Sequence, residues 1–272
     1  MADKDKKVVI LCGGEVGGIG KSTLTKLILE FISDRTDYEF YDLDSNKLDV
    51  GLVYEPDTYK VAVGEDNVAV APNPKTLIRF SDDDNIGGTV DEVFEQGLNK
   101  LVIVNLPSNC KHHLERWIND NGLVDLAKEN NIQFIYFFVC AANPDSVELF
   151  ARSLEEYGND KGLQQVLVFN EGKGVSYDRA IVGYPKLKQL AEAYKTPVLI
   201  VPKLNSLYYN EVLTKSLTFH EAKTKTDKDG LKMIGRSSVN KFLNVFNDRF
   251  TETLKALGGK VQKLAEKPGG KG

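Results

Sequence analysis

The chain has 272 residues, 42% of them hydrophobic and 27% charged, with a formal net charge of −4. This composition is ordinary for a globular protein. No run approaches the roughly 18 apolar residues of a membrane-spanning helix, which excludes an integral helical membrane protein. The charged N-terminus leads directly into the first predicted strand, so no signal peptide is expected. Three widely spaced cysteines, Cys12, Cys110 and Cys140, indicate buried thiols in a reducing cytoplasm.

The first predicted elements are a strand, a glycine-rich loop and a helix. Residues 8–11 (VVIL) form a continuous apolar run, which is typical of a strand buried on both faces. After the glycines, apolar residues recur three and four positions apart, as on one face of a helix. These residues are Leu24, Leu27, Ile28, Phe31 and Ile32.

The loop between this strand and this helix predicts a phosphate-binding site. Glycines let backbone N–H groups turn around an anion, and a helix N-terminus adds partial positive charge. Lys21 can reach the β and γ phosphates of a nucleotide, and the hydroxyl of Ser22 can bind Mg²⁺. An ordinary glycine turn before a helix is the alternative, and the strand–loop–helix setting disfavours it. The predicted cradle comprises Gly17, Gly18, Ile19, Gly20, Lys21, Ser22 and Thr23.

Further apolar runs alternate with helical patterns along the rest of the chain. The runs cover residues 38–43, 67–71, 101–106, 134–140, 166–169 and 198–201, and helices are expected at 145–157 and 186–194. This alternation predicts an α/β fold with one doubly wound, mainly parallel sheet and helices on both faces. We expect a single domain over residues 1–257 that ends in an amphipathic helix at about 237–257. Residues 258–272 are expected to form a frayed basic tail.

Polar residues follow the strands at the edge of the sheet where ligands bind in this fold class. Asp42 and Asp44 follow the second strand, and Asn105 lies at the end of the run LVIVN. Asn170 follows VLVF, and Asn205 comes soon after VLIV. Each of them alone is explained by a cap or a turn, but their recurrence at successive strand ends behind a phosphate loop favours a binding site.

Four segments together resemble the ParA/MinD family of deviant Walker-type ATPases, over about residues 6–220. They are GGIGKST, YDLDSN, LVIVNLPSN and VPKLNSLYYNEVLTKSLTFHEA. A weaker similarity points to plasmid-borne relatives that act in partition or conjugation. The resemblance implies an ATP-dependent homodimer that positions or segregates DNA or another cargo with the help of a partner protein.

The resemblance also implies roles for individual residues. Lys21 and Asp44 would act in hydrolysis, Asp44 by orienting the attacking water, and ATP or ADP would bind with Mg²⁺. The implied metal-binding residues are Ser22, Asp44 and Asn105. The base of the nucleotide would contact Asn170, Pro202, Leu204 and Asn205. The guanine-reading Asn-Lys-x-Asp motif is absent from the chain, which favours ATP over GTP.

One position departs from the general phosphate-loop pattern, and two depart from the pattern of the family. Glu15 replaces the first glycine of the phosphate loop, and Val16 replaces the signature lysine. Asn105 replaces the acidic residue of the Walker B strand, and an amide contributes no negative charge to hold a metal. Nucleotide binding is therefore predicted with slow hydrolysis.

Charge is unevenly distributed along the chain. Residues 203–272 carry 14 Lys and Arg against 7 Asp and Glu, whereas residues 1–202 carry 21 against 32. This basic part predicts non-specific DNA binding, with a membrane surface less favoured and a solvated helix as the alternative. Two other functions stay open: a small-molecule ATP-dependent enzyme similar to dethiobiotin synthetase, and a nucleotide-binding adaptor without turnover.

Overall fold

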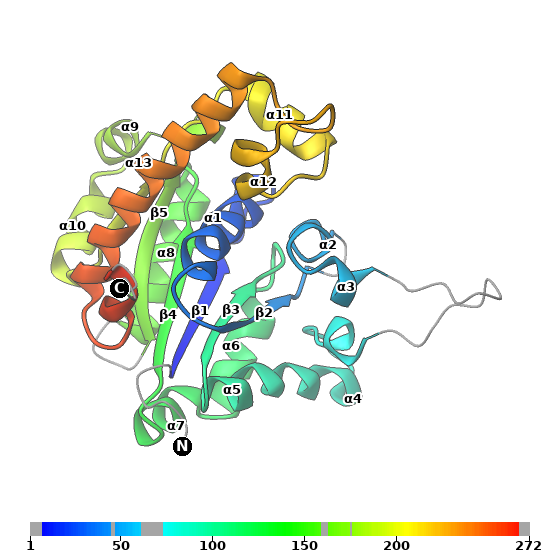
Figure 1. The fold of residues 1–272 in the computed structure, drawn as a ribbon. Coiled ribbons are helices and arrows are strands. Elements are labelled where there is room, and N and C mark those ends of the chain that lie inside the picture. The colour runs from blue at the N-terminus through cyan, green and yellow to red at the C-terminus, as the bar shows by residue number, and fades with distance from the viewer. Residues whose placement is uncertain (1–6, 45–46, 61–72, 159–162, 175, 267–272) are drawn as a thin grey trace.

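The computed structural model describes residues 7–44, 47–60, 73–158, 163–174 and 176–266. Figure 1 shows one twisted sheet with a layer of helices on each face. The strands are β1 (Val8–Gly13), β2 (Tyr38–Asp42), β3 (Leu101–Asn105), β4 (Gln133–Val139), β5 (Leu163–Asn170) and β6 (Val198–Val201). All of them pair in parallel, in the order β2-β3-β1-β4-β5-β6. The predicted doubly wound parallel sheet is confirmed.

Helices connect the strands in the alternation that the sequence predicts. The helices are α1 (Lys21–Ser33), α2 (Gly51–Tyr54), α3 (Pro56–Tyr59), α4 (Asp84–Gly87), α5 (Asp91–Gly97), α6 (Lys111–Asp120), α7 (Leu123–Glu129), α8 (Pro144–Tyr157), α9 (Tyr177–Gly183), α10 (Pro185–Ala193), α11 (Ser206–Thr214), α12 (Phe219–Thr224) and α13 (Met233–Leu257). Short 3-10 turns are η2 (Pro74–Leu77), η3 (Gly88–Val90), η5 (Glu171–Lys173) and η6 (Val261–Ala265). The helices expected at 145–157 and 186–194 correspond to α8 and α10. The strand predicted at 67–71 lies outside the described residues.

Two apolar cores lie on opposite faces of the sheet, because successive side chains of a strand point to opposite faces. Val8, Ile10 and Cys12 of β1 face the core beneath α1, α12 and α13. Val9 and Leu11 face the other core, beneath α5, α6, α7, α8 and α10. Burial on both faces explains the unbroken apolar runs of the central strands.

The last helix, α13, packs its apolar face on the sheet. Its buried residues include Val239, Phe242, Leu243, Phe246, Phe250, Leu254 and Leu257. The ring of Phe250 lies 4.9 Å from that of Phe31 in α1 and 5.7 Å from that of Phe137 in β4. The helix begins at Met233, four residues before the predicted start. The periodic pattern did not indicate this first turn, because Met233 and Ile234 are exposed and stand outside the buried face. The amphipathic face is therefore part of the core.

The chain stays packed on the domain beyond the end of α13. Gly258 and Gly259 adopt φ of 66° and 64°, which turns the chain back toward the sheet. The Val261 N–H then donates to Oε1 of Gln133 at 2.9 Å, and its side chain is fully buried. The frayed tail that the sequence predicts from residue 258 thus contains an ordered segment up to residue 266. Among the described helices, none combines the length and the apolar character that crossing a bilayer requires.

Candidate functional site

The glycine-rich loop joins β1 to α1 at the C-terminal edge of the sheet. Gly18 and Gly20 adopt φ of 73° and 106°, a region that favours glycine. A Cβ atom on Gly20 would lie 2.0 Å from Nδ2 of Asn170, so no larger residue fits there without displacing Asn170. Gly20 is also the N-cap of α1, and the first N–H groups of this helix are therefore directed toward the loop.

Lys21 is the buried cation of this loop. Its ammonium donates to Oγ of Ser108 at 2.7 Å and to the Val16 carbonyl at 3.0 Å. Burial lowers the pKa of Lys21, while nearby acidic groups such as Asp44 oppose that shift. The ammonium is thus held at the loop by partners that water or a phosphate oxygen can replace.

Glu15, where the sequence departs from the loop pattern, connects the loop to α6. Its carboxylate accepts a hydrogen bond from the Lys111 N–H at 3.3 Å, at the start of that helix. Burial raises the pKa of Glu15, and the bond from Lys111 opposes the rise. The Glu15 side chain therefore contacts α6 and does not occupy the glycine turns.

A cavity of about 590 Å³ opens beside the loop, and we call it the loop cavity. Its wall contains several of the predicted phosphate-binding residues together with charged and aromatic residues from elsewhere in the chain. The lining residues are Gly17, Gly18, Gly20, Lys21, Ser22, Thr23, Lys26, Asp44, Lys47, Asp49, Ser108, Asn109, Lys173, Tyr209 and Leu213. Its size is in the range of small-molecule and cofactor sites.

Two of the three predicted metal-binding residues, Ser22 and Asp44, lie on the wall of the loop cavity. A hydroxyl and a carboxylate are oxygen ligands of the kind that Mg²⁺ prefers. Within the described residues no cluster of three or more His, Cys, Asp or Glu side chains is placed to hold a metal. The donor set of the cavity therefore fits a cation that is bound mainly through its ligand and through water.

The third, Asn105, does not line the loop cavity. It is 1% exposed, its Oδ1 accepts from Oγ1 of Thr25 at 3.0 Å, and its Nδ2 donates to Oδ1 of Asp42 at 2.8 Å. Asn105 and Asp42 are register partners on adjacent strands, which explains their contact. Burial raises the pKa of Asp42 to about 6, and the bond from Asn105 opposes that rise. Both polar atoms of the Asn105 amide therefore form hydrogen bonds within the protein.

The four residues assigned to the base of the nucleotide do not line the loop cavity. The amide of Asn170 donates to the Ile19 carbonyl at 3.3 Å and accepts from the Gly172 N–H at 2.9 Å. Pro202 and Leu204 are buried, and the Asn205 side chain caps α11 by accepting from the Leu207 N–H. In the described residues these side chains support the loop and α11, and a base-binding role for them stays a prediction.

Several cavity residues were not predicted for this role from the sequence. Tyr209 donates to or accepts from Oγ1 of Thr23 at 2.7 Å and so connects α11 to the loop, although the two are 186 positions apart. Lys26 lies four residues after Ser22 on α1, a spacing that places the two side chains on one helix face. That spacing is the signal from which Lys26 could have been found, whereas nothing in the sequence marks Tyr209.

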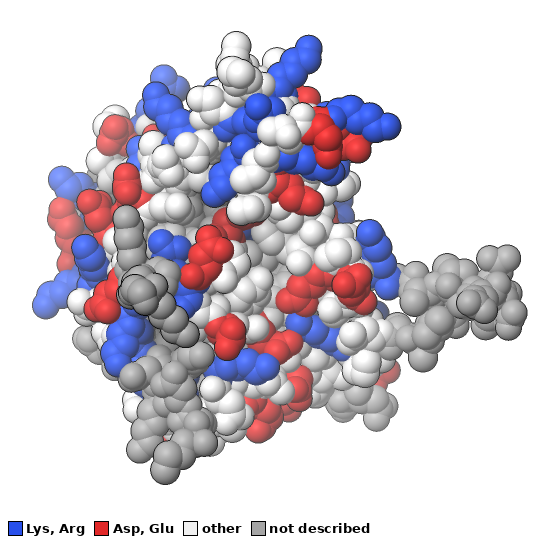
Figure 2. All heavy atoms as spheres, in the orientation of Figure 1, with Lys and Arg blue, Asp and Glu red and all other residues white. Residues whose placement is uncertain are grey.

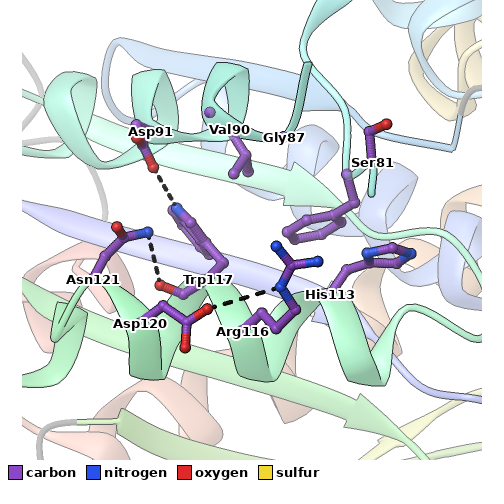
Figure 3. Close-up of a pocket in the computed structure, with 11 residues that line it drawn as sticks. Ser81, Gly87, Val90, Asp91, His113, Arg116, Trp117, Asp120 and Asn121 are labelled. Atoms are coloured by element: carbon purple, nitrogen blue, oxygen red, sulfur yellow. Dashed lines mark hydrogen bonds and ion pairs between the residues drawn. The ribbon is translucent and has the colours of Figure 1, made fainter. Parts of the chain in front are cut away.

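A second cavity of about 190 Å³ lies between α6 and the segment before α5 and shares no lining residue with the loop cavity. Figure 3 shows Arg116 turned toward Asp120, and Asp91 beside the indole of Trp117. Trp117 Nε1 donates to Oδ1 of Asp91 at 2.9 Å, and Arg116 pairs with Asp120 at 3.8 Å. His113 stacks against Phe80 with 6.1 Å between ring centroids. Within the described residues, Asp91 is thus hydrogen-bonded to Trp117, and Arg116 forms an exposed ion pair with Asp120.

Comparison with known proteins gives matches at the level of structure. No family model and no curated protein sequence matches the chain. The cell division ATPase MinD of Pyrococcus furiosus is 14% identical, with 89% of this chain and 99% of that chain covered and a TM-score of 0.51.

Two further solved structures are similar at lower TM-scores. A nucleotide-binding protein from Archaeoglobus fulgidus in complex with ADP is 16% identical, with 85% and 88% of the two chains covered and a TM-score of 0.44. A plasmid partition protein from Borrelia burgdorferi is 13% identical, with 89% and 99% covered and a TM-score of 0.44. Strand order, the position of the loop and the likeness to MinD agree: the chain has the fold of the MinD-type P-loop ATPases.

Proposed function

We propose that this chain is an ATP-binding protein of the ParA/MinD type, a dimer switch with slow hydrolysis. The observation that carries the proposal is the loop cavity, where a glycine loop, a helix N-terminus and the Lys21 ammonium converge. This combination is suited to a polyphosphate, because backbone N–H groups and a cation together neutralise its charge. The absence of a guanine-reading motif favours adenine as the base.

Mg²⁺ would be held by Ser22 and by oxygens of the nucleotide, with Asp44 beside it. When bound, the metal supplies positive charge to the phosphates. The chain itself orients the nucleotide through the loop and Lys21, and Asp44 is placed to accept a proton or a hydrogen bond from water in the cavity. Asn105 would support this arrangement indirectly, by holding Asp42 at the end of β2.

DNA is the cargo that we propose, bound non-specifically in the cytoplasm through the basic C-terminal part of an ATP-bound homodimer. Figure 2 shows Lys and Arg side chains gathered around α11, α12 and the start of α13, with acidic side chains among them. Burial of the apolar face of α13 in the core disfavours a membrane surface, since that face is not free to enter lipid. A partner protein that stimulates release is part of the proposal.

The test combines ATP hydrolysis with oligomeric state. We expect slow hydrolysis that double-stranded DNA stimulates, and a shift from monomer to dimer in size-exclusion chromatography with ATP. Anionic liposomes serve as the control surface and are expected to give no stimulation. Turnover that needs a small metabolite would instead support the synthetase-like enzyme, and tight ATP binding without turnover would support the adaptor.

Ser22→Ala is expected to remove the gain in ATP affinity that Mg²⁺ produces, and to leave the affinity in EDTA unchanged within about threefold. The reason is that Ser22 lies on the cavity wall, and a hydroxyl is an oxygen donor of the kind that Mg²⁺ prefers. Isothermal titration with and without Mg²⁺ measures both affinities. Thr23→Val is the control, because the neighbouring hydroxyl is bonded to Tyr209. An equal Mg²⁺ response in Ser22→Ala and the wild type would exclude Ser22 as a ligand.

Asp44→Ala is expected to keep ATP bound while hydrolysis falls by about 10²-fold, the usual range for losing a positioned acid or base. The residue lines the cavity without a bond to the loop, so its loss spares the phosphate cradle. Single-turnover hydrolysis and equilibrium titration separate the two effects. Asp49→Ala removes another carboxylate from the same wall and should change the rate less. A rate that Asp44→Ala leaves intact would move the proton-accepting role to another residue.

A further inference from the structure

A second lysine of α1, Lys26, lies on the wall of the loop cavity. It is 7% exposed, nearly as buried as Lys21 at 6%. The other lysines of the wall, Lys47 and Lys173, are exposed. The cavity thus has two desolvated ammonium groups on one helix, and the phosphate loop accounts for the first of them only.

The position of Lys26 follows from helix geometry. Lys26 comes one turn after Ser22, and residues four apart share a helix face. Side chains of a helix lean toward its N-terminus, so a long side chain at this position extends back toward Ser22 and the loop. Asp44 and Asp49, from the segment after β2, complete this part of the wall. Lys26 therefore belongs to the side of the cavity where the hydroxyl of Ser22 lies.

The ammonium of Lys26 has no hydrogen-bond or ion-pair partner among the described residues. Lys21 donates to Ser108 and Val16, whereas Lys26 has neither a hydrogen bond nor an ion pair within the described part of the chain. Asp49 and Asp42 attract it from a longer distance, and burial lowers its pKa. A buried charge without a paired group is costly, and proteins rarely retain one unless a ligand or a paired group compensates it.

We propose that Lys26 is a second phosphate-binding cation of the loop cavity, and that it binds the terminal phosphate of a nucleoside triphosphate. The proposal rests on the proposed ATP-binding function and deepens it. The loop N–H groups bind the inner phosphates, Lys21 reaches the β and γ phosphates, and the hydroxyl of Ser22 lies toward the outer end, where Mg²⁺ binds. Lys26, on the same face as Ser22, is therefore nearer the terminal phosphate than the α phosphate. Its contribution distinguishes a triphosphate from a diphosphate.

The test compares ATP with ADP on Lys26→Met, a change that keeps the apolar length of the side chain. We expect ATP affinity to fall at least about tenfold and ADP affinity to change less than about threefold, because only ATP carries the phosphate that Lys26 binds. Lys173→Met is the matched control, since it removes a charge from an exposed position on the same wall. Lys26→Arg, which keeps the charge, should retain most of the preference for ATP.

Thermal unfolding of the free protein separates binding from folding. Lys26→Met is expected to unfold at the same temperature as the wild type or higher, because it removes a desolvated charge that has no hydrogen-bond or ion-pair partner among the described residues. Equal losses for ATP and ADP, unchanged affinities, or an Arg variant as impaired as the Met variant would each overturn the role of Lys26. A wild type that binds neither nucleotide would overturn the proposed function itself.

Discussion

Lys21→Ala is expected to lower ATP affinity at least about 100-fold, equivalent to about 2.7 kcal/mol. The Lys21 ammonium is the buried cation of the loop, and a charge-assisted hydrogen bond to phosphate in a desolvated cavity is among the strong ones. Neither Lys47 nor Lys173 can replace it, because both are exposed on the wall. Isothermal titration with ATP measures the loss.

The control for Lys21→Ala is Lys173→Ala, which removes a solvent-exposed charge from the same cavity. We expect it to change ATP affinity less than about threefold, since exposed charges contribute little. Folding of Lys21→Ala should be intact, because Ser108, whose hydroxyl loses this bond, lines the cavity, and Val16, whose carbonyl loses the other, is partly exposed. Affinity equal to that of the wild type would mean that the loop does not bind the phosphates.

The fold was predictable because its signals are local and repeated. Apolar runs mark every described strand of the sheet, and their continuity reflects burial between the two cores. The loop was predictable for the same reason, since Gly20, Lys21 and Ser22 are adjacent in the sequence and act together. Boundaries were less predictable: α13 begins with two exposed apolar residues that carry no helical periodicity.

The chemistry of the wall was harder to predict because it depends on side-chain direction. Asn105 occupies the predicted strand end, yet its amide is hydrogen-bonded to Thr25 of α1 and to Asp42 at the end of β2. Lys26 reads in the sequence as one more charged residue of an amphipathic helix, and only the fold shows that it is buried. Tyr209 reaches the loop from α11 across a long sequence separation. The four-residue spacing indicates only that Lys26 shares a helix face with Ser22, and no spacing rule encodes the burial of Lys26 or the contact of Tyr209.

The burial of Asp42 gives the wild-type protein a definite pH dependence of stability. Burial raises the pKa of Asp42 to about 6 in the folded state, above its ordinary value. Between about pH 4 and pH 6 the folded chain therefore holds a proton that the unfolded chain has released. The contribution of this group to the free energy of unfolding is full below this window and is lost as the pH rises through about 6.

Asn105→Asp should extend the pH-dependent loss of stability to higher pH. The exchange replaces the amide donor to Asp42 with a carboxylate at the same position, 2.8 Å away, in a site that is 1% exposed. Two buried carboxylates at this distance resist simultaneous ionisation, so the pair retains a proton that the wild type releases. We expect the free energy of unfolding to fall by about 2–3 kcal/mol at pH 8 relative to the wild type, the cost of losing a hydrogen bond to a charged group. Near pH 5, where the pair shares a proton, the difference should shrink to below about 1 kcal/mol.

Urea unfolding of the wild type and Asn105→Asp at pH 5 and pH 8 measures both differences. The matched control is the double variant Asp42→Asn with Asn105→Asp, which exchanges the amide and the carboxylate across the two strands. Because it restores one donor and one acceptor, it should recover more than half of the stability lost at pH 8. A loss that is equal at both pH values, or a double variant as unstable as the single one, would show that the two side chains are not coupled. In that case the conformation of Asp42 would depend on its bonds from the Gly51 and Asp44 N–H groups.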